Sequence, residues 1–169
     1  HGDYFESEEY VLSSAIGHLL ELVAPEGVEV KRGKWSFANL PVIPPHFDLK
    51  PIERTEDRLK VLLKLLKRKD VTGVINACDA GREGELIFRY IMQHAGNKKP
   101  IQRLWLQSMT QGSIREGFEG LRSDKSMLPL ADAAVCRSES DWLVGINGTR
   151  AMTAFNSKEG GFYKTTVGR

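Results

Sequence analysis

The chain has 169 residues, a length that suits one compact domain or one domain with an added lobe. Its composition, 41% hydrophobic and 27% charged, is ordinary for a globular protein. Its net charge of +2 permits nucleic-acid binding without arguing for it, because the clustering of basic residues matters more than their sum. The two cysteines have no CxxC spacing, which argues against a disulfide framework or zinc site and favours a reducing cytoplasm; no apolar run has the length of a membrane span, and no signal peptide is visible.

The first third of the chain predicts one strand and a loop-rich stretch after it. The apolar run at residues 10–16 predicts a buried strand that ends at a Gly-His pair. His18 of that pair is either a turn residue or a side chain that lines a crevice beyond the strand. Residues 24–56 contain five prolines and are expected to form loops, with a short extended piece at Trp35 and Phe37.

An amphipathic helix is predicted to begin at Asp57. Its apolar stripe follows the spacing i, i+3, i+4 and i+7 and consists of Leu59, Leu62, Leu63 and Leu66. Its other face carries the basic residues Lys60, Lys64, Lys67 and Arg68. That face is either a solvated helix surface, as charge runs usually are, or a nucleic-acid patch.

Strands and helices then alternate in the manner of a parallel sheet with right-handed helical crossovers. The predicted order is a strand at 71–77, a helix at 82–94 closed by Gly96-Asn97, a strand at 101–107, and a helix at 110–121 with Thr110 as its N-cap. From about Leu130 the pattern changes to one long helix that runs toward Phe155, and a loop is expected at Gly160-Gly161.

The junction between the strand at 71–77 and its following helix holds the strongest chemical signal. Three carboxylates and one guanidinium fall there within seven residues: Asp79, Arg82, Glu83 and Glu85. Carboxylate oxygens are the ligands that Mg²⁺ prefers, helix N-termini stabilise phosphates, and an arginine can give a phosphate two parallel hydrogen bonds. Because open α/β sheets bind ligands beyond the carboxyl ends of their strands, the junction predicts a metal and phosphate site.

The same junction has a simpler interpretation. Glu83 and Glu85 would then only complement the helix dipole, and Asp79 would cap the helix. Gly81 and Gly84 are expected to keep side chains out of the way of an approaching backbone. The segment lacks both the GxxxxGK[ST] of a P-loop and the GxGxxG of a dinucleotide fold, so no nucleotide cofactor is expected.

Several segments, in order, resemble type IA DNA topoisomerases. DAGREGELIF, which contains the acidic cluster, resembles the metal-binding motif of Toprim domains in the form that these enzymes carry, most like topoisomerase III. Segments at 13–22, 34–47, 103–110 and 137–153 and the final TTVGR are similar to further family segments. The resemblance covers essentially the whole chain and is more specific than the acidic cluster alone.

The resemblance implies a fold and an activity. The fold is a Toprim domain, a Rossmann-like parallel sheet flanked by helices, at residues 1–125, followed at 126–169 by the start of a helical DNA-binding domain. The activity is to cut one DNA strand with a tyrosine, pass another strand through and reseal the gap, with Mg²⁺ as cofactor. The implied partner is single-stranded or underwound DNA near the nucleoid of the bacterial cytoplasm, with no membrane and no nucleotide involved.

By match to the family motif, Asp79 and Glu83 are catalytic metal ligands. Gly81 stands where the family's DxDxE pattern has its middle Asp, which leaves one ligand fewer. Arg82 is expected to bind DNA phosphate. The family's first Toprim strand with its catalytic Glu, and the nucleophilic tyrosine, are expected to lie outside this chain, which should therefore be inactive alone. The chain's tyrosines match neither context: Tyr4, Tyr10, Tyr90 and Tyr163.

The long helix and the second strand supply the other expected DNA contacts. By match, Arg137 contacts the phosphate beside the cut and Asp141, four residues on, tunes opening around DNA; the alternative is an ordinary surface ion pair. Arg150 is a further phosphate-contact candidate. Gly145 and Gly148 are expected to leave room for a DNA backbone.

The sequence also predicts which way Trp142 and Arg103 face. Trp142 is expected to face the core, with base stacking as the alternative. Leu104 and Leu106 should be buried, which leaves Arg103 facing the DNA.

Two other functions remain open. Another Toprim protein, a primase or a nuclease, would keep the acidic cluster but should lack the helix at 137–153 and the VGR ending. A non-catalytic α/β module that binds a nucleotide or an acidic partner would show no preference for single-stranded DNA and no metal at Asp79.

Overall fold

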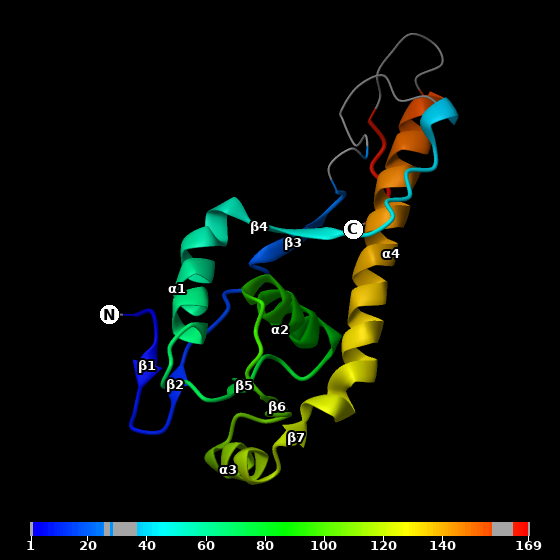
Figure 1. Ribbon diagram of the computed structural model, residues 1–169. Helices are drawn as coiled ribbons and strands as arrows, with labels where there is room; N and C mark the ends of the chain where they lie inside the picture. Colours follow the sequence, from blue (N-terminus) through cyan, green and yellow to red (C-terminus); the bar gives the residue numbers. More distant parts are fainter. Residues whose placement is uncertain (1, 26–27, 29–36, 157–163, 169) are drawn as a thin grey trace. The chain divides into compact units, whose positions relative to one another are not determined.

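The computed structural model describes residues 2–25, 28, 37–156 and 164–168 (Figure 1). Its residues cluster into two compact units: unit 1 is His1–Glu21 with Leu49–Ala134, and unit 2 is Leu22–Asp48 with Val135–Arg169. The features expected at Trp35, Gly160-Gly161 and Tyr163 lie outside the described residues. The domain boundary predicted after residue 125 was drawn from sequence motifs, and it stays a prediction.

Unit 1 is built on a three-stranded sheet in the order β5 (Val74–Asn76), β6 (Ile101–Arg103) and β7 (Arg122–Ser123). β5 and β6 are parallel, and their register pairs Asn76 with Arg103 at the carboxyl ends. β7 is antiparallel to β6. The α/β class and the parallel central pair are therefore as predicted, and the sheet is mixed because of β7.

Helices connect these strands (Figure 1). α2 (Arg82–Ala95) is the crossover from β5 to β6, and α3 (Gln111–Glu119) joins β6 to β7. The predicted ends are confirmed: α2 stops at Gly96, whose φ of 59° is left-handed, and the amide of Ser113 donates to the N-cap Thr110 Oγ1 at 3.3 Å. α2 also supplies much of the core, through Leu86, Phe88, Tyr90, Ile91 and Met92.

The helix predicted from Asp57 is α1 (Glu56–Leu66), and it buries Leu59. Two cations of its basic face already have acidic partners within unit 1. Lys60 pairs with Glu56 at 3.2 Å, and Arg68 binds Asp70 through a hydrogen bond that lowers the pKa of that carboxyl to about 2. These contacts favour the solvated surface over the nucleic-acid patch.

The strand predicted at residues 10–16 is wrong in extent and burial. Only β2 (Val11–Leu12) forms, and it pairs antiparallel with β1 (Phe5–Glu6) in a short hairpin where Leu12 is 61% exposed. Arg58 of α1 anchors this hairpin by donating to the carbonyl of Asp3 at 2.7 Å. The buried core begins later, at Leu19 and at the first residue of β3 (Leu20–Val23), both of which lie beyond the apolar run.

β3 forms a two-stranded sheet with β4 (Asp48–Pro51), and short 3₁₀ turns occupy Phe37–Asn39 and Glu53–Thr55. The extended piece expected at Phe37 is therefore wrong. The long predicted helix is α4 (Asp124–Asn156), which starts before Leu130 and includes Pro129. Among the described residues, no helix has both the length and the apolarity needed to cross a bilayer.

In unit 2, the C-terminal segment at 164–168 lies along α4. The amide of Val167 donates to Thr149 Oγ1 at 2.9 Å, and the amide of Thr165 donates to Thr153 Oγ1 at 3.1 Å. Asn147 of α4 holds another segment: its Nδ2 donates to the carbonyl of Val42 at 2.8 Å, and its Oδ1 accepts from the Val42 amide at 2.5 Å. Side chains of one helix thus supply backbone partners for two irregular segments.

Candidate metal and nucleic-acid site

The predicted metal ligands lie on the surface where β5 gives way to α2. The amide of Cys78 donates to Asn76 Oδ1 at 3.1 Å, which turns the chain out of the strand, and Asp79 follows in an exposed position. Glu83 lies in the first turn of α2 with its side chain 73% exposed. Arg82 is exposed at the first position of the helix. These placements match the sequence prediction, and the ligand roles stay predictions.

A close approach of two backbones defines this junction. A Cβ atom on Gly84 would overlap the carbonyl oxygen of Asp79 and lie 2.8 Å from its nitrogen. Gly81, in extended backbone, has nothing within 4 Å of its would-be Cβ. The approaching backbone that Gly84 must accommodate is therefore the chain's own Asp79, while Gly81 faces open space.

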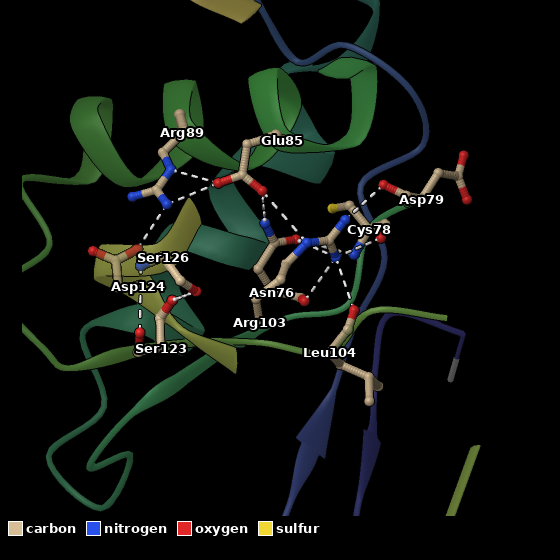
Figure 2. Close-up of polar contacts among 10 residues, drawn as sticks. All are labelled: Asn76, Cys78, Asp79, Glu85, Arg89, Arg103, Leu104, Ser123, Asp124 and Ser126. Carbon is tan, nitrogen blue, oxygen red and sulfur yellow. Dashed lines mark hydrogen bonds and ion pairs between the residues drawn. The ribbon is translucent and has the colours of Figure 1, made fainter. Parts of the chain in front are cut away.

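Glu85 is the third carboxylate of the cluster, and it turns inward (Figure 2). Its side chain is 0% exposed and accepts from Asn76 Nδ2 at 3.0 Å and from Arg89 Nε at 2.8 Å. Arg89 extends the network to Asp124 at 2.7 Å, at the start of α4. Glu85 therefore serves a buried network and is not a surface carboxylate that complements the helix dipole.

The outward orientation predicted for Arg103 is wrong. This residue is 1% exposed, and its guanidinium lies 3.4 Å from Glu85 Oε2. The prediction assumed strand alternation up to residue 107, whereas β6 ends at Arg103 itself, opposite Asn76. Leu104 is buried as expected. Burial lowers the pKa of Arg103 and the charge of Glu85 opposes that shift, but the group is enclosed and cannot contact DNA at the surface.

Arg103 instead holds the loop that leads to Asp79 (Figure 2). Its Nη1 donates to the carbonyls of Asn76 at 2.9 Å and Cys78 at 2.6 Å, and its Nη2 donates to the carbonyl of Asp79 at 2.7 Å. Burial also raises the pKa of the Cys78 thiol, which is half-buried beside this guanidinium.

His18 reaches the site from outside the junction. Gly17 turns the chain with a φ of 72°, and His18 Nε2 then forms a hydrogen bond with Glu83 Oε1. Of the two alternatives for His18, this contact favours the side chain that lines the site. A cation bound by Glu83 would compete with His18 for the same carboxylate.

The donor set suits a hard cation that keeps most of its water. Within the described ranges, no group of three or more His, Cys, Asp or Glu side chains could hold a metal ion. Mg²⁺ is commonly bound through one or two carboxylates, with waters and phosphate oxygens as its other ligands. Asp79 and Glu83 fit that mode, and they do not fit a closed protein cage.

The predicted DNA contacts of α4 separate into two groups in unit 2. Arg137 and Asp141 form an exposed i,i+4 pair, with Arg137 Nε 2.8 Å from Asp141 Oδ2. Both side chains are open to solvent, so a phosphate contact and a simple surface pair both remain compatible with their placement. Arg150 is only 6% exposed, and its phosphate contact stays a prediction.

The room predicted beside Gly145 and Gly148 is already filled. A Cβ on Gly148 would lie 2.9 Å from Val167 Cγ1, and one on Gly145 would lie 3.6 Å from the Val167 carbonyl oxygen. These glycines therefore accommodate the C-terminal segment, and the prediction of a DNA backbone there is wrong. Trp142 and Phe47 form a T-shaped ring pair with 5.0 Å between centroids, as expected for the core-facing alternative of Trp142.

Sequence reasoning missed the supporting residues Asn76, Arg89, Asp124 and Asn147. One signal was available, because Glu85 and Arg89 have the i,i+4 spacing of a helical ion pair. The others depend on strand register or on long-range contacts, which no local pattern reveals.

Comparisons with known proteins fit this geometry. Residues 3–109 match the family model described as the Toprim domain. The chain is 44% identical over 156 residues to DNA topoisomerase 3 of Bacillus subtilis (strain 168), a match that covers 92% of the chain and 22% of that protein. It is 43% identical over 150 residues to DNA topoisomerase 3 of Staphylococcus epidermidis, covering 89% and 21%. The chain thus spans about a fifth of the length of the curated relatives it matches.

Proposed function

We propose that this chain, which belongs to the Toprim domain family, supplies the metal site and part of the DNA-binding surface of a type IA DNA topoisomerase. The observation that carries the proposal is the exposed pair Asp79 and Glu83 at the carboxyl end of β5. That pair lies in a chain similar over most of its length to DNA topoisomerase 3. We place the Toprim domain at residues 1–125 and the start of a helical DNA-binding domain at 126–169, in a cytoplasmic protein that acts at the nucleoid.

The proposed activity of the whole protein is to cut, pass and reseal single DNA strands. Within it, Asp79 and Glu83 hold Mg²⁺, which when bound neutralises and orients the phosphate oxygens of the cut end. Arg82 lies at the N-terminus of α2, where a phosphate is also stabilised by the helix dipole. Arg137 binds a backbone phosphate and Asp141 holds its guanidinium in place. The nucleophilic tyrosine belongs elsewhere in the parent protein, so this chain binds DNA and metal without cutting.

The metal site is tested by adding Mn²⁺ and following the broadening of amide NMR signals. We expect selective loss of the signals from Asp79 to Glu83, because a paramagnetic ion bound there relaxes nearby protons. Asp79→Asn removes one of the two proposed ligands and should abolish the effect, whereas Asp132→Asn, at an exposed carboxylate on α4, should leave it unchanged. Identical broadening in the wild type and Asp79→Asn would refute the assignment.

The DNA surface is tested by binding single- and double-stranded oligonucleotides over a salt series. We expect tighter binding to single strands than to double strands. The affinity should fall as salt is added, because binding releases counterions from the DNA and salt makes that release less favourable. Arg137→Ala should lower the affinity about tenfold, roughly 1.4 kcal/mol, and reduce the salt slope by about 0.7 through loss of one phosphate contact. Arg115→Ala, at an exposed arginine of α3, is the matched control. Equal binding to both DNA forms, unaffected by Arg137→Ala, would instead favour a non-catalytic module.

A further inference from the structure

We propose that Arg103 is a positioning residue for Asp79: it fixes the main chain of the ligand loop, Cys78 and Asp79, so that the Asp79 carboxylate is held outward toward the cation. The metal part of this inference rests on the proposed function. The loop geometry does not, because it follows from contacts within unit 1.

One guanidinium binds the two successive carbonyls of the loop. Nη1 of Arg103 donates to the Cys78 oxygen at 2.6 Å and Nη2 donates to the Asp79 oxygen at 2.7 Å. Both peptide planes are therefore fixed by one rigid, planar group. A lysine ammonium is a point charge on a flexible stem and does not reproduce this fork. The side chain of Asp79 itself points away from the network (Figure 2), so fixing its main chain is what aims the carboxylate.

Arg103 is itself held by groups outside the ligand loop. Its Nη1 also donates to the Asn76 carbonyl at 2.9 Å, and Glu85 balances its charge at 3.4 Å. Glu85 is held in turn by Asn76 and Arg89. A buried ion pair is a poor source of net stability, because desolvation offsets most of the attraction. What this pair provides is orientation, and the group it orients is the loop that carries Asp79.

Arg89 offers a matched control for Arg103. Both arginines bind the Glu85 carboxylate, but Arg89 contacts its other oxygen and leads to Asp124, away from the ligand loop. Arg103→Lys and Arg89→Lys each keep the positive charge and shorten the reach. A general loosening of the buried network would affect both variants alike, whereas a specific effect on Asp79 would appear in Arg103→Lys alone.

Two readouts separate positioning from stability. The first is the Mn²⁺ dissociation constant of the chain, measured from free Mn²⁺ by electron paramagnetic resonance. Arg103→Lys should raise it about 10- to 100-fold, the usual effect of losing a group that orients a ligand, and Arg89→Lys should change it less than about twofold. The second uses no metal: in a Cys136→Ser background, alkylation of the half-buried Cys78 should become at least about tenfold faster in Arg103→Lys only, because loop opening controls access.

The outcomes are distinguishable. If Arg103→Lys leaves both readouts at the wild-type values, or if Arg89→Lys changes them equally, Arg103 has no positioning role. If Arg103→Lys does not fold, the double variant Glu85→Gln/Arg103→Gln removes both buried charges, and it should fold yet bind Mn²⁺ more weakly; wild-type affinity there overturns the inference. If the wild type binds no Mn²⁺, the proposed metal function fails, and Cys78 alkylation still decides whether Arg103 holds the loop.

Discussion

Replacing Gly84 with alanine is expected to destabilise unit 1 by about 2–3 kcal/mol, the cost of forcing a methyl group into a filled space. Its new Cβ would overlap the backbone oxygen of Asp79, and a backbone atom cannot swing aside as a flexible side chain can. Relief requires that α2 or the ligand loop move. Urea denaturation followed by circular dichroism measures the change in the free energy of unfolding.

Gly81→Ala is the control, only three residues away in the same junction. Its backbone is extended and its Cβ meets nothing within 4 Å, so the free energy of unfolding should change by less than about 0.5 kcal/mol. Equal destabilisation by the two substitutions would show that the junction tolerates no side chain for a reason other than the approach of Asp79.

Glu85→Ala is expected to have a still larger effect, about 3–5 kcal/mol, because it leaves a buried arginine without its counter-charge. Arg103 cannot reach solvent from its enclosed position, and Asn76 Nδ2 loses its acceptor as well. For a chain of this size, the melting temperature should fall by roughly 6–20 °C. Calorimetry or thermal circular dichroism measures this shift.

Glu83→Ala tests whether the effect belongs to burial rather than to the acidic cluster. This carboxylate is largely exposed and pairs with His18, so its removal should cost less than about 1 kcal/mol. A Glu85→Ala variant as stable as Glu83→Ala would mean that Arg103 finds another partner when Glu85 is lost.

The elements of unit 1 were largely predictable because their signals are local. The hydrophobic period places the start of α1, the C-cap Gly96 places the end of α2 and the N-cap Thr110 places the start of α3, each within about two residues. Asp79 and Glu83 were found for the same reason, since a β-prone run followed by a turn and a helix start is visible in sequence. The apolar run at residues 10–16 led to a wrong prediction, because hydrophobicity alone cannot tell a buried strand from an exposed hairpin whose strands are two residues long.

The arginines and glycines were less predictable because their roles depend on distant partners. Arg103 was assigned to the surface from alternation, but its direction is set by where β6 stops and by Glu85 on another element. Gly148 was expected to face DNA, yet it faces Val167 of the same chain. A small residue indicates close approach, and only the fold shows what approaches.

The two hydrogen bonds between Asn147 and Val42 also bear on the chemical stability of the protein over time. Asn147 is followed by Gly148, the sequence in which an asparagine amide most readily hydrolyses to a carboxylate. That change would replace the Nδ2 donor, 2.8 Å from the Val42 carbonyl, with a negatively charged oxygen that repels it. The helical backbone and the three hydrogen bonds of the amide, to the Val42 amide and to the carbonyls of Val42 and Leu143, slow this reaction by restraining the side chain. Loss of this amide nitrogen would remove one of the two hydrogen bonds between Asn147 and Val42 and leave the other, from the Val42 amide to a side-chain oxygen.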